Sequence, residues 1–380
     1  MLSKLAVVVS LGLSLVSPAT GRQFPAPFFE ETPVFVSGQD HINTYRIPAL
    51  ICSEKGTLLA FSEGRRSGSK DGVPTDIVLK RSVGAVDGVP RQGTAWRPMQ
   101  TLIRSKHGEA YMNPLPLIDR TDGTIYLFVN YYPQPYADLP AEIWLLKSQD
   151  DGETWTGPVN ITRGTGKHEL GPSAGIQLHS GRLVAAVYDG VIFSDDHGKT
   201  WKPSRKATGA VSETQVVELV DGTLLLNRRG KITRRVMRSE DGGLTWSEPK
   251  AAPELPDADC QGTLIRYTRE DDGYTKNRLL FANPVAGMNP KTIQTSDPRG
   301  RFNITVRLSY DEGKSWPVAK LVKPGPVAYS SMTVLPDGSI GMLYEVGDNI
   351  HGYFGHYQKV VFARFNLEWL TDGKDHMEKK

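Results

Sequence analysis

The sequence contains few of the residues that mark disulfide-rich or metal-binding proteins. Only two of its 380 residues are cysteines, Cys52 and Cys260, which excludes a disulfide-dense scaffold. These two can pair in an oxidising compartment or remain buried thiols. The eight histidines are scattered, and no HExxH or CxxC pattern occurs, so we expect no metal and no other cofactor.

Strong charge and long apolar runs are also missing. The formal net charge is +3, too small to indicate a polyanionic partner, and the basic stretch 228–238 is typical of the solvated side of a hairpin. We therefore expect no nucleic-acid binding. No stretch reaches the apolar length of a transmembrane helix, so we expect no membrane span. The oligomeric state is not indicated.

The N-terminal residues resemble a targeting segment. Lys4 is followed by an apolar run over residues 5–16, too short to span a bilayer, and then by Ser17-Pro18-Ala19, small residues that suit cleavage. We expect residues 1–22 to be a signal peptide and residues 23–380 to be a secreted or periplasmic protein. A buried N-terminal helix is the alternative.

One short pattern, Ser-x-Asp-x-Gly-x-Thr/Ser-Trp, occurs four times, and we call it the Asp-turn repeat. The copies are SQDDGETW from Ser148, SDDHGKTW from Ser194, SEDGGLTW from Ser239 and SYDEGKSW from Ser309. The Asp can accept backbone N–H bonds, the Gly permits a positive φ, and the Trp can anchor the turn to apolar surface. The copies start 46, 45 and 70 residues apart, which indicates one supersecondary unit used repeatedly.

Short strand-like runs separate these turns, and no amphipathic helix of a dozen residues follows the N-terminal segment. The clearest runs are 124–129, 143–146, 182–187, 223–226, 304–308 and 339–344. A period near 45 residues with about four strands per unit predicts an all-β, six-bladed β-propeller as a single domain. A degenerate copy from Ser82 to Trp96 counts as the fifth unit. The C-terminal strands 333–335, 339–344 and 360–365 with an N-terminal strand near 33–36 form the sixth. A β-helix or β-sandwich fits the period less well.

The residues with chemical potential lie outside the repeats. They are Arg46 in Tyr45-Arg-Ile-Pro48, Arg65 after Phe61-Ser-Glu-Gly64, Asp71 in the Gly- and Ser-rich segment 67–72, Glu213, Arg229, Arg301, Tyr329 in Ala328-Tyr-Ser-Ser331, and Glu345 after Leu343-Tyr344. Taken singly, each has an ordinary interpretation as a surface cation, turn residue or rim aromatic. The occurrence of all these residues together with the repeats, in this order along the chain, indicates a function more specifically than any one of them does.

That combination resembles the sialidases (neuraminidases), in particular the exo-acting bacterial and animal enzymes, in which the repeats are called Asp boxes. The resemblance extends from Tyr45-Arg-Ile-Pro48 to the segment 362–369. It implies a six-bladed propeller that hydrolyses terminal sialic acids from glycoproteins, glycolipids or oligosaccharides.

The resemblance also implies a role for each residue. Arg46, Arg229 and Arg301 correspond to the arginines that clamp the substrate carboxylate, and Glu345 to the acid that orients Arg46. Asp71 corresponds to the general acid/base, Tyr329 to the nucleophile and Glu213 to its partner base. Arg65, preferred over Arg66, corresponds to a contact near the sugar's O4, and Arg301 is preferred over Arg299. Met112, Asn113 and Gln261 lie in segments that resemble pocket walls, although packing under a loop is an equally good interpretation.

Elementary chemistry agrees with these roles. A planar guanidinium binds a carboxylate through paired donors, and a neutral phenol avoids the repulsion that a carboxylate nucleophile would meet at an anionic sugar.

Three alternative functions remain open. A trans-sialidase would use the same residues, a sialic-acid-binding lectin or adhesin would need only the arginines, and a scaffold propeller would need neither set.

Overall fold

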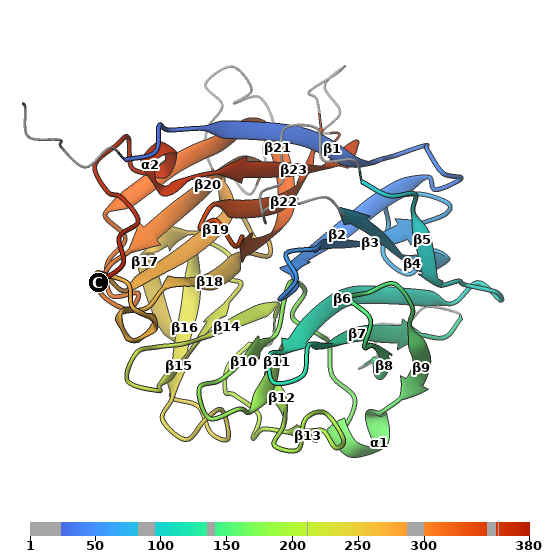
Figure 1. Ribbon diagram of the computed structural model, residues 1–380. Helices are drawn as coiled ribbons and strands as arrows, with labels where there is room; N and C mark the ends of the chain where they lie inside the picture. The colour runs from blue at the N-terminus through green and yellow to red at the C-terminus, as the bar shows by residue number, and fades with distance from the viewer. Residues whose placement is uncertain are drawn as a thin grey trace, which may run out of the picture.

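The architecture is almost entirely β (Figure 1). The computed structural model describes residues 24–82, 96–134, 141–210, 212–286, 300–347, 355 and 357–380. Within these ranges the helical elements are the four-residue α1 (Thr162–Thr165) and α2 (Leu367–Leu370) and the 3-10 turn η2 (Glu270–Asp272). No helix of the described part is long and apolar enough to cross a bilayer. The signal peptide predicted for residues 1–22 lies outside the described residues.

Two sheets are simple antiparallel meanders of four strands. The first contains β10 (Ile176–Gln177), β11 (Leu183–Val187), β12 (Gly190–Ser194) and β13 (Lys202–Pro203). The second contains β14 (Thr214–Glu218), β15 (Leu224–Arg228), β16 (Thr233–Ser239) and β17 (Lys250–Pro256). In both, strand order in the sheet follows strand order in the chain, as the repeat predicts.

A larger sheet joins two such units. One unit contains β2 (Thr44–Cys52), β3 (Leu58–Arg65), β4 (Thr75–Ser82) and β5 (Gln100–Ile103). The other contains β6 (Ala110–Asp119), β7 (Thr124–Tyr132), β8 (Glu142–Ser148) and β9 (Thr156–Asn160). The only residues paired between β4 and β6 are Thr75 and Ala110, in parallel orientation. The two units are therefore joined into one sheet by a single backbone pairing, while their apolar side chains pack together in one cluster.

The remaining sheet brings the two chain ends together. It contains β18 (Thr263–Thr268), β19 (Arg278–Ala286), β20 (Arg301–Ser309), β21 (Val318–Val334), β22 (Ile340–Val346), β23 (Lys359–Phe365) and β1 (Phe29–Val36). The long β21 pairs with β20 through its first half and with β22 through its second half. β1 pairs antiparallel with β23, from Phe29 opposite Phe365 to Val36 opposite Lys359, which confirms the predicted pairing of the ends.

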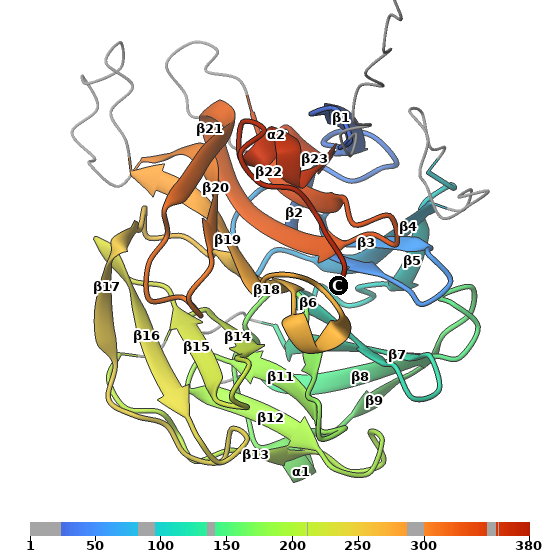
Figure 2. The same cartoon turned by 60° about the vertical axis from the view of Figure 1, so that its left-hand side comes forward.

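The sheets stand around a common centre, and the chain runs once around it. In Figure 1 the colour changes progressively around the molecule, and blue β1 lies beside red β23; Figure 2 shows the same arrangement turned by 60° about the vertical axis. The strands nearest the centre contact one another in turn. These contacts are β2 with β6, β6 with β10, β11 with β14, β14 with β18, β18 with β21, and β21 with β2. The fold is therefore propeller-like, as predicted.

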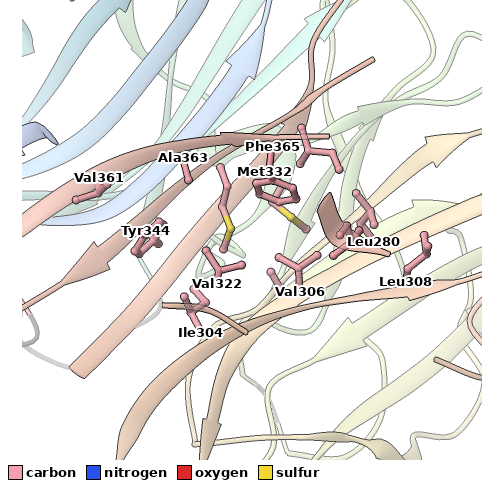
Figure 3. Packing of buried hydrophobic residues seen from close by; sticks show 14 of the residues in the cluster. Leu280, Ile304, Val306, Leu308, Val322, Met332, Tyr344, Val361, Ala363 and Phe365 are labelled. Carbon is pink, nitrogen blue, oxygen red and sulfur yellow. The ribbon is translucent and has the colours of Figure 1, made fainter. Parts of the chain in front are cut away.

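Apolar side chains fill the spaces between neighbouring layers. In the cluster of Figure 3, Ile304, Val306 and Leu308 of β20 point to one face, and Val361, Ala363 and Phe365 of β23 do the same. This spacing of two residues is the side-chain period of a strand, and the alternate residues Val360 and Phe362 of β23 are buried in a second cluster on the opposite face. Burial on both faces of such strands explains how each sheet packs against a neighbour on either side.

Each Asp-turn repeat closes on its own side chains. In the copy from Ser194, Asp196 accepts hydrogen bonds from the Thr200 N–H (2.9 Å) and hydroxyl (2.6 Å), and Ser194 Oγ accepts one from the Gly198 N–H (2.8 Å). Gly198 has φ 69°, and a Cβ there would lie 2.4 Å from the Tyr126 ring, so only glycine fits. Trp201 packs on Phe128 of the neighbouring unit, with ring centroids 4.7 Å apart, which is the anchoring role predicted for the Trp.

Two other predictions have a structural outcome. Cys52 and Cys260 are both free, so the interpretation as unpaired thiols is confirmed; Cys260 is buried as expected, whereas Cys52 is only half-buried. The degenerate repeat lies mostly outside the described residues, but its end residues Ser82 and Trp96 pair in an isolated antiparallel bridge.

Replacing Asp196 with Ala should destabilise the fold by about 0.5–1.5 kcal/mol, because the hydrogen bonds from Thr200 lose their acceptor at an exposed position where water partly replaces it. Those bonds lower the pKa of Asp196 from its ordinary 3.8 to about 2. A carboxyl group whose pKa is lower in the folded than in the unfolded protein stabilises the fold at any pH above its unfolded-state pKa. This contribution is lost as the pH falls through its folded-state pKa. Urea unfolding should therefore separate wild type from variant at pH 7 and much less near pH 2. Lys199→Ala, an exposed change in the same turn, should match wild type; equal stability of Asp196→Ala at pH 7 would contradict this role.

Candidate active site

A phenol and a carboxylate meet at the centre of the site. Tyr329, on β21, is 6% exposed, and its hydroxyl donates a hydrogen bond to Glu213, which directly precedes β14. Burial and the Glu213 carboxylate raise the pKa of Tyr329 well above its ordinary value, although Arg301 and Arg229 act in the opposite direction. The resting phenol is therefore neutral, with a carboxylate in place to receive its proton.

The three predicted clamp arginines surround this phenol. The Cζ atoms of Arg46 and Arg301 lie 5.2 and 5.4 Å from the centre of the Tyr329 ring, and Arg229 Nη1 lies 3.4 Å from the Tyr329 hydroxyl. Arg46 is on β2, Arg229 follows β15, and Arg301 begins β20. Residues 255 positions apart in the sequence are thus brought to one place, as the notion of a clamp requires.

Glu345 links three segments below the phenol. This fully buried carboxylate on β22 accepts hydrogen bonds from Arg46 Nε (3.3 Å), the Ile47 N–H (2.7 Å) and the Tyr329 N–H (3.1 Å). Burial alone would lower the pKa of Arg46, but Glu345 and the neighbouring tyrosines raise it above its ordinary value. Glu345 therefore holds Arg46 charged and in place, the position predicted for it.

The other two arginines share Asp259. Arg229 pairs with Glu213 (2.8 Å) and, through Nε, with the Asp259 carboxylate (2.8 Å), whereas Arg301 donates to the Asp259 carbonyl (3.0 Å). Burial acts to lower the pKa of Arg229, but Glu213 and Tyr329 raise it by more. The cationic form of Arg229 is therefore strongly favoured.

Asp71 lies at the open side of the site. Its side chain is 59% exposed and contacts Arg65 Nη2 at 2.8 Å and Arg46 Nη1 at 3.7 Å. Arg65 is fully buried and also pairs with Glu63 (2.7 Å). Arg66 turns away to Asp76 (2.8 Å), so Arg65 is the one of the two that reaches Asp71. Arg299, the alternative to Arg301, lies outside the described residues.

The three predicted wall residues have other contacts. Met112, 5% exposed, packs with Ala110, Tyr132 and Ala141. Asn113 donates its N–H to Glu63 (2.8 Å), and its side chain bonds Asn130 (3.2 Å). Gln261 donates to the Pro172 carbonyl (3.1 Å) and accepts from the Ser330 N–H (3.0 Å), next to the nucleophile candidate. Gln261 thus holds the backbone beside Tyr329, whereas the Asn113 N–H holds the Glu63 carboxylate.

Three residues of the site were not singled out from the sequence: Glu63, Asp259 and Tyr357. Glu63 lies in the segment Phe61-Ser-Glu-Gly64, two positions before Arg65 on the same strand. Its closeness to Arg65 in the sequence was the one signal that could have identified it as a site residue. Asp259 and Tyr357 contact Arg229, Arg46 and Arg301 only through the fold. In the described ranges, no group of three or more His, Cys, Asp or Glu side chains is arranged to hold a metal ion.

A cavity of about 470 Å³ opens among the inner strands but contains none of these residues. It is lined by positions farther along the same strands, including Ile51 of β2, Val217 of β14 and Met332 of β21. The cavity and the candidate site therefore occupy different positions along the same inner strands.

Glu345→Ala should destabilise the protein by about 3–5 kcal/mol, because it leaves the buried Arg46 charge and two backbone N–H groups without their acceptor. Thermal and urea unfolding measure this loss. Glu54→Ala, which removes an exposed pair with Arg120, should cost at most about 1 kcal/mol. Equal small losses for both variants would contradict the linking role of Glu345.

Known proteins of one family resemble this chain in sequence and in fold. Residues 56–342 match the family described as "BNR repeat-like domain". The chain is 32% identical to a sialidase of Micromonospora viridifaciens, over 96% of this chain and 58% of that protein, so it spans little more than half of this relative. It is 30% identical to an exo-alpha-sialidase of Aspergillus fumigatus, over 92% of this chain and 93% of the relative. The solved structure of the Hadza microbial sialidase Hz136 superposes with a TM-score of 0.73 at 28% identity, covering 88% of this chain and 68% of that one. The chain therefore belongs to the sialidase family.

Proposed function

We propose that this protein is a retaining exo-α-sialidase that releases terminal sialic acids from glycoproteins, glycolipids or oligosaccharides. The observation that carries the proposal is the contact of Tyr329 with Glu213 inside a ring of three arginines. A lectin would need the arginines but not a buried phenol paired with a base. Asp71, on the open side of the same site, completes the set required for hydrolysis.

The arginines would bind the carboxylate on the anomeric carbon of the sugar. At about 4 Å and an effective dielectric near 20, one pair of unit charges attracts by about 4 kcal/mol before desolvation. Guanidinium groups also offer paired N–H donors that match a carboxylate. Arg46, Arg229 and Arg301 would thus select an anionic sugar and fix its anomeric carbon beside Tyr329.

In the first chemical step, Tyr329 Oη would form a bond to the anomeric carbon as the bond to the leaving oxygen breaks. Glu213 would take the phenolic proton, since it already accepts that hydrogen bond. Asp71 would donate a proton to the departing oxygen, so the aglycone leaves as a neutral alcohol. The product of this step is a tyrosyl-linked sugar.

In the second step, water would attack the same carbon from the face that the leaving group vacated. Asp71 would remove a proton from this water, and the Tyr329 oxygen would leave and recover its proton from Glu213. Two inversions at one carbon return the original configuration. The exposed position of Asp71 suits a group that must meet both the leaving alcohol and incoming water.

The scaffold proposal is a six-bladed β-propeller that forms one catalytic domain over residues 23–380. The two four-stranded sheets, the two units of the larger sheet and the two units sharing β21 support six blades. We also propose that residues 1–22 direct export and that the mature protein acts as a secreted or periplasmic enzyme. The apolar run over residues 5–16 supports this.

The direct test is incubation of the purified protein with a fluorogenic aryl α-sialoside between pH 4 and 8. Release of the fluorophore is the expected result, and its absence across this range would favour a lectin. Sialyl-lactose with excess free lactose labelled on its reducing end separates hydrolysis from transfer. Free sialic acid should dominate; labelled sialyl-lactose as the main product would establish a trans-sialidase instead.

Tyr329→Phe should lower kcat on the fluorogenic sialoside by at least about a thousandfold, because the nucleophilic oxygen is gone. Binding of free sialic acid, measured by calorimetry, should change little, since the arginines remain. Tyr267→Phe, which also removes one hydroxyl from a buried tyrosine, should retain full activity. Weakened binding with unchanged kcat would contradict the role of Tyr329.

Asp71→Asn should harm substrates with poor leaving groups most, because a good leaving group needs little acid assistance. We expect the loss in kcat/KM to be about a hundredfold larger for sialyl-lactose than for the aryl sialoside, within the usual range for general acid catalysis. Asp271→Asn, at another exposed carboxylate, should leave both rates unchanged. Equal losses on both substrates would show that Asp71 is not the acid.

A further inference from the structure

Tyr357 occupies a fixed position beside the site. It stands just before β23, half-buried against Ile47, Cys260, Ala328 and Tyr329. Its carbonyl accepts a hydrogen bond from Ser37 Oγ (2.7 Å), and the next residue, Gln358, is held by backbone hydrogen bonds to Ser37 and Val346. The β1 and β22 edges therefore determine where this side chain projects.

The aromatic ring and the hydroxyl of Tyr357 contact two different arginines. The face of its ring lies 4.0 Å from Arg46 Cζ, a cation–π contact shorter than the one Arg46 makes with Tyr329. Its hydroxyl accepts a hydrogen bond from Arg301 Nη1 (3.4 Å). The other terminal nitrogen of Arg301 donates to the Asp259 carbonyl, so the phenol completes the hold on this guanidinium.

These contacts resolve a physical problem. Arg46 and Arg301 both approach Tyr329, and their positive charges repel each other. This repulsion is visible in the pKa of Arg301, which burial lowers most and Arg46 lowers further. Cys260 and the neighbouring tyrosines act in the opposite direction, so the pKa is raised overall. A ligand carboxylate binds best when its donors are already oriented, because ordering them on binding costs free energy. The ring face of Tyr357 orients Arg46, and its hydroxyl oxygen orients Arg301. Neither contact adds a carboxylate that would compete with the ligand for the arginines.

We propose that Tyr357 is a positioning residue that sets the spacing of Arg46 and Arg301 and thereby the affinity for the sugar carboxylate. The proposal rests on the proposed function for the identity of the ligand. Tyr357 acts through the two arginines, so it should influence binding much more than bond breaking.

Two variants separate its two contacts. Tyr357→Phe keeps the aromatic face and removes the acceptor for Arg301; Tyr357→Leu removes both. KM for the aryl sialoside and the Kd for free sialic acid should rise about tenfold in Tyr357→Phe, from the loss of a hydrogen bond to a charged group. Both should rise about a hundredfold in Tyr357→Leu, from the added loss of the cation–π contact. The kcat of each should stay within about twofold of wild type, because Tyr329, Glu213 and Asp71 are untouched.

The matched control is Tyr310→Phe. Tyr310 also combines a hydroxyl hydrogen bond, to Asp375 (3.0 Å), with a ring near a buried arginine, Arg278 (6.0 Å), but lies away from the site. It should leave KM, Kd and kcat unchanged. If Tyr357→Phe lowers the melting temperature and kcat while KM and Kd stay constant, Tyr357 is only structural and the proposal fails.

Binding and turnover also distinguish this proposal from the proposed function. A wild-type protein that binds sialic acid without releasing it would overturn the hydrolase, and the Kd series of the variants would still decide the role of Tyr357. A wild-type protein that neither binds nor hydrolyses would overturn both. Unchanged Kd in both Tyr357 variants would overturn the positioning role alone.

Discussion

Three largely buried arginines around one phenol are the constraint on which the rest of the structure depends. Like charges so close together destabilise the folded chain unless anions accompany them. Glu345 accompanies Arg46, and Glu213 and the Asp259 carboxylate accompany Arg229. Glu213 contacts both Arg229 Nη1 and the Tyr329 hydroxyl, so the carboxylate that accompanies this arginine is also the acceptor of the phenolic hydrogen bond.

The ring of sheets makes this arrangement possible. The inner strands carry their site residues near one end, so segments far apart in the sequence meet around Tyr329. A local distortion helps: the pairing of β2 with β3 shifts register between Arg46 and Ala49, and Ile47 adopts φ 53°, which is unfavourable for a β-branched residue. The Ile47 N–H bond to Glu345 stabilises the distortion and turns Arg46 toward the site.

Much of the fold could be predicted from the sequence because its signals are local. Ser194, Asp196, Gly198 and Thr200 bond to one another within seven residues, so the turn chemistry is visible in the chain itself. The short strands between the turns and the pairing of the chain ends were predicted from the same repeated pattern. The joining of units into larger sheets was not predicted, because it depends on single contacts such as Thr75 with Ala110 and on the length of β21.

The candidate site divides in the same way. Seven residues were identified through their resemblance to an ordered family motif, and the structure brings them together: Arg46, Asp71, Glu213, Arg229, Arg301, Tyr329 and Glu345. Asp259 and Tyr357 escaped because nothing near them in the sequence marks them; only the fold brings them to Arg229, Arg46 and Arg301. Residues that hold other functional residues in place are the hardest to find by pattern, since their partners are distant in the chain.

The central claim is that Tyr329 becomes covalently bonded to the sugar. Brief incubation with a 3-fluorinated sialosyl fluoride, which forms the intermediate readily but hydrolyses slowly, should trap it. Mass spectrometry of the digested protein should then find one added sugar on the peptide that contains Tyr329. A sugar attached to Glu213 or Asp71 instead, or turnover of the reagent with no adduct at any time, would contradict the account.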